Sequence, residues 1–300
     1  MRRPSLFAAV TVGLVVTASV SARQPGRGLD LATTLERAGQ RVEQYFARAQ
    51  TLVCLETVYV QPLGAGLSPD GVGRTIESEM RLDWDPFAGA DGPVEARTLR
   101  QVLKVNGRPP RPRDHNNCTA PEQHETETQP LSMLLPAQRR EYAFSLAGLG
   151  RVDRRSAIMV DYKLLAQPSV EVQEVAGNED CISFSLSGGL RGRIWLDADS
   201  YDVLRLDQGL MGLIEIPLPK KASRRNGTES WTMERWDSSI RFKPVAFQDP
   251  DEMLLLPVQM SSLRITRGSG TPRLRTVTDY SRYRRFLTGG RIVKEPGSSE

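Results

Sequence analysis

The sequence predicts a mainly β protein of the α+β class, with one N-terminal amphipathic helix and a large, mostly antiparallel sheet. Apolar residues recur at helical spacing over residues 31–49, and from Thr51 onward the period changes to two, with turn residues at short intervals. The candidate strands are too numerous for a flat sheet. This indicates a sheet that curls into a sandwich or a partial barrel.

The chain begins with a pattern typical of a secretory signal. Two arginines precede an apolar run from Leu6 to Val20, and small residues follow up to Ala22, after which we expect cleavage. A membrane anchor is the alternative, but this run is shorter than the roughly 20 apolar residues that a span needs. We therefore expect residues 1–22 to be removed and the mature chain to be periplasmic or extracellular, with no transmembrane segment.

Charge and length limit the possible partners and the domain organisation of the mature protein. Loss of the two N-terminal arginines would lower the formal charge from +4 to +2, and basic residues are interspersed with acidic ones, so we expect no nucleic-acid partner. Residues 30–293 are predicted to form one half-barrel domain, preceded by a flexible leader at residues 23–29. It carries long loops at residues 107–130 and 217–228, and residues 294–300 are predicted to be a disordered tail.

A helix is predicted from Leu31 to Ala49. Asp30 is placed to cap its N-terminus. Its apolar stripe spans fewer than three heptads, which favours packing on a sheet over a coiled coil. The stripe consists of Leu31, Leu35, Ala38, Val42, Tyr45, Phe46 and Ala49.

Alternating apolar and polar residues predict the strands that follow. The candidates are residues 51–61, 74–84, 97–105, 142–146, 157–164, 170–175, 182–186, 191–196, 202–207, 229–242, 254–266 and 274–286. In the strand at residues 229–242, simple alternation predicts that Trp231 and Trp236 lie on opposite faces.

Residues 190–209 are predicted to form a hairpin. Its strands run from Arg191 to Leu196 and from Asp202 to Asp207, joined by a polar connection. Alternation places four apolar residues on one face, namely Ile194, Leu196, Leu204 and Leu206. Trp195 falls on the polar face, where Arg193 or Arg205 can stack on its ring.

Cysteine and histidine usage gives no catalytic or metal pattern. Because an exported protein reaches an oxidising compartment, we expect one disulfide. We favour Cys118 with Cys181, because both lie in polar surroundings, whereas Cys54 lies in an apolar segment. His115 and His124 bracket Cys118, but their spacing matches no zinc motif. We therefore expect no metal, no cofactor and no enzymatic activity.

The hairpin resembles the signature hairpin of the periplasmic lipoprotein-carrier superfamily, the LolA and RseB type proteins. The similar letters are Ile194-Trp195-Leu196-Asp197, Ser200 and Leu204-Arg205, and the helix before the first strand and the closing strand at residues 278–286 are similar in order. The resemblance implies a curved antiparallel sheet, an unclosed half-barrel packed around the N-terminal helix. Tyr201 departs from the pattern, because a glycine commonly follows the serine in such turns.

These observations predict an exported, non-enzymatic binding or sensing protein. The concave face would hold an acyl chain, a lipoprotein or an apolar peptide. The candidate lining residues are Leu35, Val42 and Phe46 on the helix and Ile194, Leu196, Leu204 and Leu206 on the sheet, although a filled core would use the same residues. The alternative is a structural or interaction module of the envelope with a filled core and basic outer loops such as residues 220–225. An enzyme using His115 and His124 is the third hypothesis, and nothing in the sequence indicates the oligomeric state.

Overall fold

A computed structural model describes residues 29–49, 51–84, 96–115, 130–175, 178–248, 251–268 and 273–285. Residues 1–28, which hold the predicted signal and all but the last residue of the predicted leader, lie outside these ranges, as do residues 116–129 of the first long loop and the predicted tail. The helices are α1 (Leu31–Arg48), α2 (Pro112–His115), α3 (Pro136–Arg139) and α4 (Lys220–Asn226), with a 3-10 turn η2 at Ser132–Leu134.

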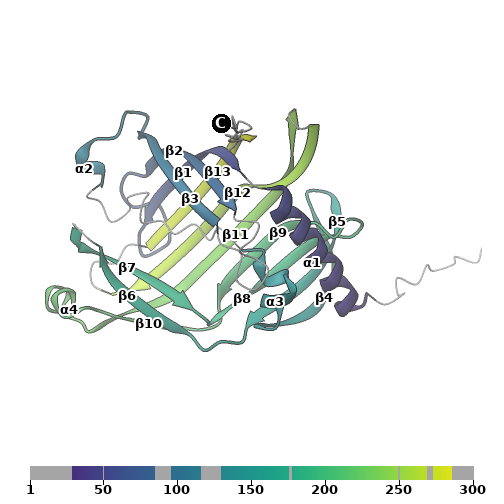
Figure 1. Cartoon of the computed structure of the whole chain (residues 1–300). Coiled ribbons are helices and arrows are strands. Elements are labelled where there is room, and N and C mark those ends of the chain that lie inside the picture. The colour runs from purple at the N-terminus through teal and green to yellow at the C-terminus, as the bar shows by residue number, and fades with distance from the viewer. Residues whose placement is uncertain are drawn as a thin grey trace, which may run out of the picture.

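One large antiparallel sheet dominates the molecule (Figure 1). Its strand order is β3-β2-β1-β13-β12-β11-β9-β8-β5-β4, with β10 paired to β11, and β6 and β7 form a separate two-stranded sheet. The strands are β1 (Leu52–Leu63), β2 (Arg74–Trp84), β3 (Ala96–Val105), β4 (Tyr142–Val152), β5 (Arg155–Leu164), β6 (Ser169–Val175), β7 (Asn178–Ser187), β8 (Leu190–Asp197), β9 (Val203–Leu210), β10 (Ile214–Pro217), β11 (Ser230–Gln248), β12 (Asp251–Arg267) and β13 (Arg273–Arg285). Within the described residues the end strands β3 and β4 do not pair, which confirms the predicted unclosed antiparallel sheet with an N-terminal helix.

Helix α1 begins where the sequence predicts. A side-chain oxygen of Asp30 accepts a hydrogen bond from the backbone N–H of Thr33 at 2.8 Å, which satisfies one of the free donors of the first turn. The buried stripe contains Leu35, Val42 and Phe46. In Figure 1 the helix lies across β9, β8, β5 and β4, and its stripe packs on the face of the sheet that we call the inner face.

Strand pairing identifies the residues of the inner face, because directly opposite residues on neighbouring strands point to the same side. One row of mostly apolar residues, which we call the apolar row, crosses the sheet in a continuous register. It consists of Val160, Ile194, Leu206, Ile240, Met260, Thr278, Val58 and Ile76. Its first four members pack with α1 into the main hydrophobic core.

The predicted hairpin is confirmed as β8 and β9, but Leu204 does not join the core cluster that contains Ile194, Leu196 and Leu206. A β-bulge shifts the register after Trp195, so that Leu196 lies opposite Val203. Val203 therefore joins Leu206 in the core against α1, whereas Leu204 is buried outside that cluster. The extra residue of a bulge reverses the alternation on one side of it.

Tyr201 adopts the left-handed backbone conformation that its side chain disfavours, with a φ of 63°. Two contacts hold it there. Its backbone N–H donates to the carbonyl of Asp197 at 3.0 Å, and Arg37 of α1 donates to its hydroxyl at 3.3 Å while lying over its ring. The hairpin turn is thus fastened to the helix.

The segment at residues 217–228, predicted as an exposed loop, contains the short helix α4. Strand β10 just before it was not predicted, because its four residues are too few for a clear alternation.

Asp197 organises the hairpin turn from a buried position. One carboxylate oxygen accepts from the backbone N–H groups of Asp199 and Ser200 at 3.1 and 2.9 Å, and the other forms an ion pair with Arg155 at 2.7 Å. Burial acts to raise the pKa of Asp197, but the donors of Ser200 and Asp199 and the charge of Arg155 outweigh it, and the pKa is lowered.

We predict that Asp197→Ala lowers the free energy of unfolding by about 3 kcal/mol in urea titrations, because the buried donors lose their acceptor. The control Asp199→Ala removes an exposed carboxylate of the same turn and should change it by less than about 0.5 kcal/mol. A depressed pKa contributes stability above the pKa of the unfolded carboxyl, and this contribution disappears as the pH falls through the folded value. Equal effects of both variants would contradict this role.

Candidate functional site

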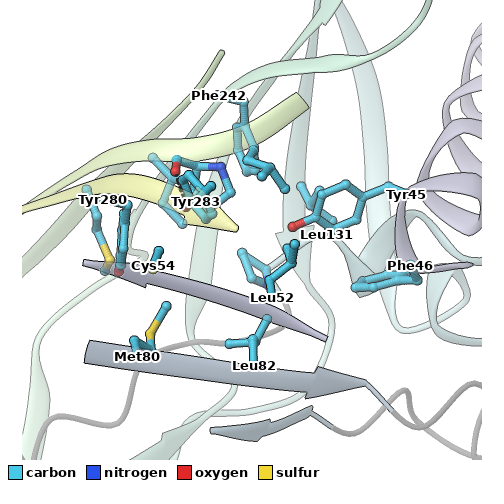
Figure 2. Close-up of a pocket in the computed structure, with 15 residues that line it drawn as sticks. Tyr45, Phe46, Leu52, Cys54, Met80, Leu82, Leu131, Phe242, Tyr280 and Tyr283 are labelled. Carbon is cyan, nitrogen blue, oxygen red and sulfur yellow. Dashed lines mark hydrogen bonds between the residues drawn. The ribbon is translucent and has the colours of Figure 1, made fainter. Parts of the chain in front are cut away.

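An apolar cavity of about 60 Å³ lies between the C-terminal end of α1 and the inner face of the sheet. Figure 2 shows the side chains of Leu52, Leu82, Leu131 and Phe242 pointing toward a common space. The lining residues are Tyr45, Phe46, Leu52, Cys54, Met80, Leu82, Pro130, Leu131, Ile240, Phe242, Leu256, Pro257, Met260, Tyr280 and Tyr283.

Alternation along paired strands builds the floor of the cavity. Leu52 and Cys54 are two apart on β1 and lie directly opposite Leu82 and Met80 on β2, so all four side chains share the inner face. At the other side, Phe46 leaves the last turn of α1, and its ring meets that of Tyr45 edge-on at 5.3 Å. The cavity therefore exists because α1 ends before it has covered this part of the sheet.

Three tyrosines of the lining stay neutral. Burial raises the pKa of Tyr45, Tyr280 and Tyr283 above the ordinary phenol value. The hydroxyl of Tyr283 donates a hydrogen bond to the carbonyl of Pro257. In Figure 2 the hydroxyl of Tyr45 points into the cavity near Leu131, where it gives the apolar space a polar group without a charge.

Cys54 is buried in the cavity wall as a free thiol. Burial, with a smaller contribution from the negative charge of Glu56, raises its pKa to about 12. The thiolate is the reactive form of cysteine, so this side chain behaves as a small apolar group at neutral pH.

A buried ion pair lies beside the cavity on the same face. Glu56 follows Cys54 by two residues on β1, and its carboxylate accepts from Nε of Arg100 on β3 at 2.8 Å. The guanidinium also lies 3.7 Å from the sulfur of Met80, which lines the cavity. The pair neutralises both charges where the apolar lining ends.

The predicted lining residues divide between this cavity and the filled core beside it. Phe46 lines the cavity. Leu35, Val42, Ile194, Leu196 and Leu206 are packed together in the core between α1 and the hairpin, and Leu204 is buried elsewhere. The hollow space thus lies next to the position that the hairpin pattern indicated. Most of its walls come from β1, β2, β12 and β13, where the alternation was visible in the sequence but the pairing was not.

A groove of about 750 Å³ is lined by charged side chains of the outer face, and Tyr162, Gln208, Ser238 and Ser262, which alternation places on the inner face, also border it. Arg193 pairs with Asp161 at 2.6 Å and Arg205 pairs with Asp207 at 2.7 Å. Trp195 donates from Nε1 to Asp207 at 3.0 Å, and the guanidiniums of Arg193 and Arg205 lie 5.9 and 5.8 Å from its ring. The predicted arginine stacking on Trp195 is confirmed, and both arginines take part.

Cys118 and His124 lie outside the described residues, as do the side chains of Cys181 and His115. The Cys118–Cys181 disulfide therefore stays a prediction. Among the side chains that are described, no three His, Cys, Asp or Glu residues are grouped as a metal ion would require. No helix in the described ranges has the length and apolar character needed to cross a bilayer.

No protein-family model matches the chain, and no curated protein matches it. Solved structures do match. An outer membrane lipoprotein-sorting protein domain from Vibrio parahaemolyticus is 10% identical, over 87% of this chain and 96% of that one, with a TM-score of 0.40. A LolA superfamily protein from Nitrosomonas europaea is 9% identical, over 89% and 98%, with a TM-score of 0.33.

The MucA/MucB complex of Pseudomonas aeruginosa also matches, at 10% identity over 83% of this chain and 99% of that one, with a TM-score of 0.22. The superfamily that the hairpin resembles is thus named among the matched structures.

We predict that Cys54 resists alkylation in the folded protein, because burial and a raised pKa leave almost no accessible thiolate at pH 8. Iodoacetamide followed by peptide mass mapping should find Cys54 unmodified in buffer and fully modified in denaturant. Rapid labelling in buffer would show that the cavity wall opens to solvent.

Proposed function

We propose that this chain is an exported, non-enzymatic binding protein that holds the apolar tail of an amphiphile, such as an acyl chain, in the cavity between α1 and the inner face. The observation that carries the proposal is an apolar hollow beside an otherwise filled core. A hollow with apolar walls holds water poorly, so that an apolar ligand gains free energy by entering it.

The size of the cavity sets what enters it. A water molecule needs about 10–15 Å³ by the same measure, so about 60 Å³ accommodates the end of a chain rather than its full length. Met80 and Met260 lie in the walls, and methionine side chains adapt their shape at small cost. Each additional methylene that is buried contributes about 0.8 kcal/mol.

The titratable groups at the cavity favour binding over acid–base chemistry. Cys54 and the three tyrosines are held neutral, and Glu56 is paired with Arg100. A general acid or base would need a pKa close to the working pH. The core residues Leu35, Val42, Ile194, Leu196 and Leu206 would then form the rigid wall behind the ligand.

Export is part of the proposal and rests on the signal pattern of residues 1–22. An acyl chain, the lipid moiety of a lipoprotein and an apolar peptide all present a narrow apolar end. We favour the acyl chain, because the cavity offers few polar groups for the backbone of a peptide.

A second candidate function, an interaction module of the envelope, is favoured by helix α4. Its seven residues carry Lys220, Lys221, Arg224 and Arg225 without an acidic side chain. Such a basic segment attracts an acidic partner surface.

We predict that a fluorescent fatty acid binds the protein and that Met260→Trp weakens binding at least tenfold, because indole fills the cavity. The matched control is Met253→Trp on the same strand, whose side chain is 58% exposed and outside the cavity. Binding is measured by fluorescence titration, and thermal unfolding checks that both variants fold. Absence of binding to the wild-type protein, or equal binding by both variants, would refute the cavity as the site.

The second candidate predicts a different pattern. Replacing the four basic residues of α4 with serine should abolish cross-linking to envelope proteins in cells and leave fatty-acid binding unchanged, because α4 does not contribute to the cavity. Unchanged cross-linking would count against an interaction role for this helix.

A further inference from the structure

A row of polar side chains crosses the inner face directly beside the apolar row. It consists of Tyr162, Gln208, Ser238, Ser262 and Thr276. Each lies directly opposite the next on the neighbouring strand, except that Gly192 of β8 lies between Tyr162 and Gln208. The hydroxyl of Tyr162 donates to the side-chain oxygen of Gln208 at 3.1 Å. We call this set the polar row.

Gly192 makes this arrangement possible. A Cβ at that position would overlap the backbone oxygen of Asp207, and it would lie 2.6 Å from the hydroxyl oxygen of Tyr162, so glycine is required here. The missing side chain lets the phenol lie across β8 and reach Gln208.

The polar row separates two apolar regions. On one side, Ile240 and Met260 line the cavity. On the other side, Met233, Trp231 and Trp236 pack with β6, β7 and β10 into a second cluster. The inner face is therefore divided into an apolar zone, a polar zone and another apolar zone.

Arg264 lies at the border of the second cluster. It follows Ser262 by two residues on β12 and lies directly opposite Trp236 and Leu274, so it belongs to the inner face. Across the described part of the chain it forms no hydrogen bond and no ion pair. Burial lowers its pKa, although an arginine stays protonated at neutral pH.

Arg264 is partly buried and so keeps only part of its hydration. A charge that loses hydration is stabilised when hydrogen bonds and an opposite charge replace the water. The outer-face arginines show the contrast, since Arg193 and Arg205 each pair with an aspartate while remaining more accessible to solvent. An anion brought in by a ligand would supply the partner that the described residues do not.

We propose that Arg264 binds the anionic headgroup of the amphiphile whose tail enters the cavity. Met260, Ser262 and Arg264 lie on one face of β12. Met260 lines the cavity and Ser262 belongs to the polar row. At roughly 3.3 Å per residue, the backbone from Met260 to Arg264 spans about 13 Å. A guanidinium binds carboxylate and phosphate oxygens in the same bidentate manner. This inference rests on the proposed function and narrows its ligand class to anionic amphiphiles.

The test compares dodecanoate, dodecyl phosphate and dodecanol, which share one tail, as competitors of the fluorescent fatty acid. We expect Arg264→Gln to weaken binding of one or both anionic competitors about tenfold and to leave dodecanol unchanged. Arg264→Lys keeps the charge and should recover part of the loss. Arg267→Gln is the matched control, because it removes an exposed arginine from the same strand, and it should alter none of the three.

The competitors also identify the headgroup. If Arg264→Gln weakens the binding of dodecanoate alone, the proposal is supported and the headgroup is a carboxylate. If it weakens the binding of dodecyl phosphate alone, the proposal is supported and the headgroup is a phosphate. The headgroup proposal is overturned if the wild-type protein binds the three competitors with equal affinity. It is also overturned if Arg264→Gln weakens the binding of all three equally. Either result leaves the proposed binding of the tail intact. If dodecanol also fails to bind the wild-type protein, the proposed function itself fails. Thermal unfolding of each variant shows that it remains folded.

Discussion

The backbone ladder that joins β5, β8, β9, β11, β12, β13 and β1 in one register is the constraint on which the structure depends. Side chains alternate along each strand, so a slip of one residue at any pairing would exchange the inner and outer rows beyond it. That register decides which side chains share a face. It therefore determines the core beneath α1, the cavity, the polar row and the charged groove. No single strand specifies any of them.

The helix is fixed on this sheet by the hairpin turn. Arg37 contacts Tyr201, and Nε of Arg41 donates to Asp202 at 2.7 Å. Both contacts tie one side of α1 to the end of β8 and β9, and the ion pair of Arg48 with Glu252 at 3.0 Å holds its C-terminal end on β12. Because α1 stops at Arg48, the inner face of β1 and β2 is left partly uncovered. The position of the cavity therefore depends on a turn whose backbone conformation is unfavourable for its own tyrosine.

Sequence periodicity was sufficient for the helix, for nearly all strands and for the hairpin, because each of these is a local pattern of burial. It failed where the chain departs from strict alternation. A bulge moved Leu204 out of the predicted cluster, and another bulge near Arg235 brings Trp231 and Trp236 into one cluster, although simple alternation placed them on opposite faces. The cavity could not be predicted, because its walls join residues 45–82, residues 130–131 and residues 240–283, which strand pairing and helix packing bring together from distant parts of the sequence.

The lack of pairing between β3 and β4 in the described chain gives the sheet a property that a closed barrel does not have. In a closed barrel, strand number and shear fix the radius, and the interior cannot grow without breaking the ladder. An open sheet has no such perimeter, so a change in its curvature enlarges the enclosed volume while every ladder hydrogen bond persists. The open edges of this sheet therefore leave the volume beneath α1 free to change with curvature, which a closed ladder would prevent.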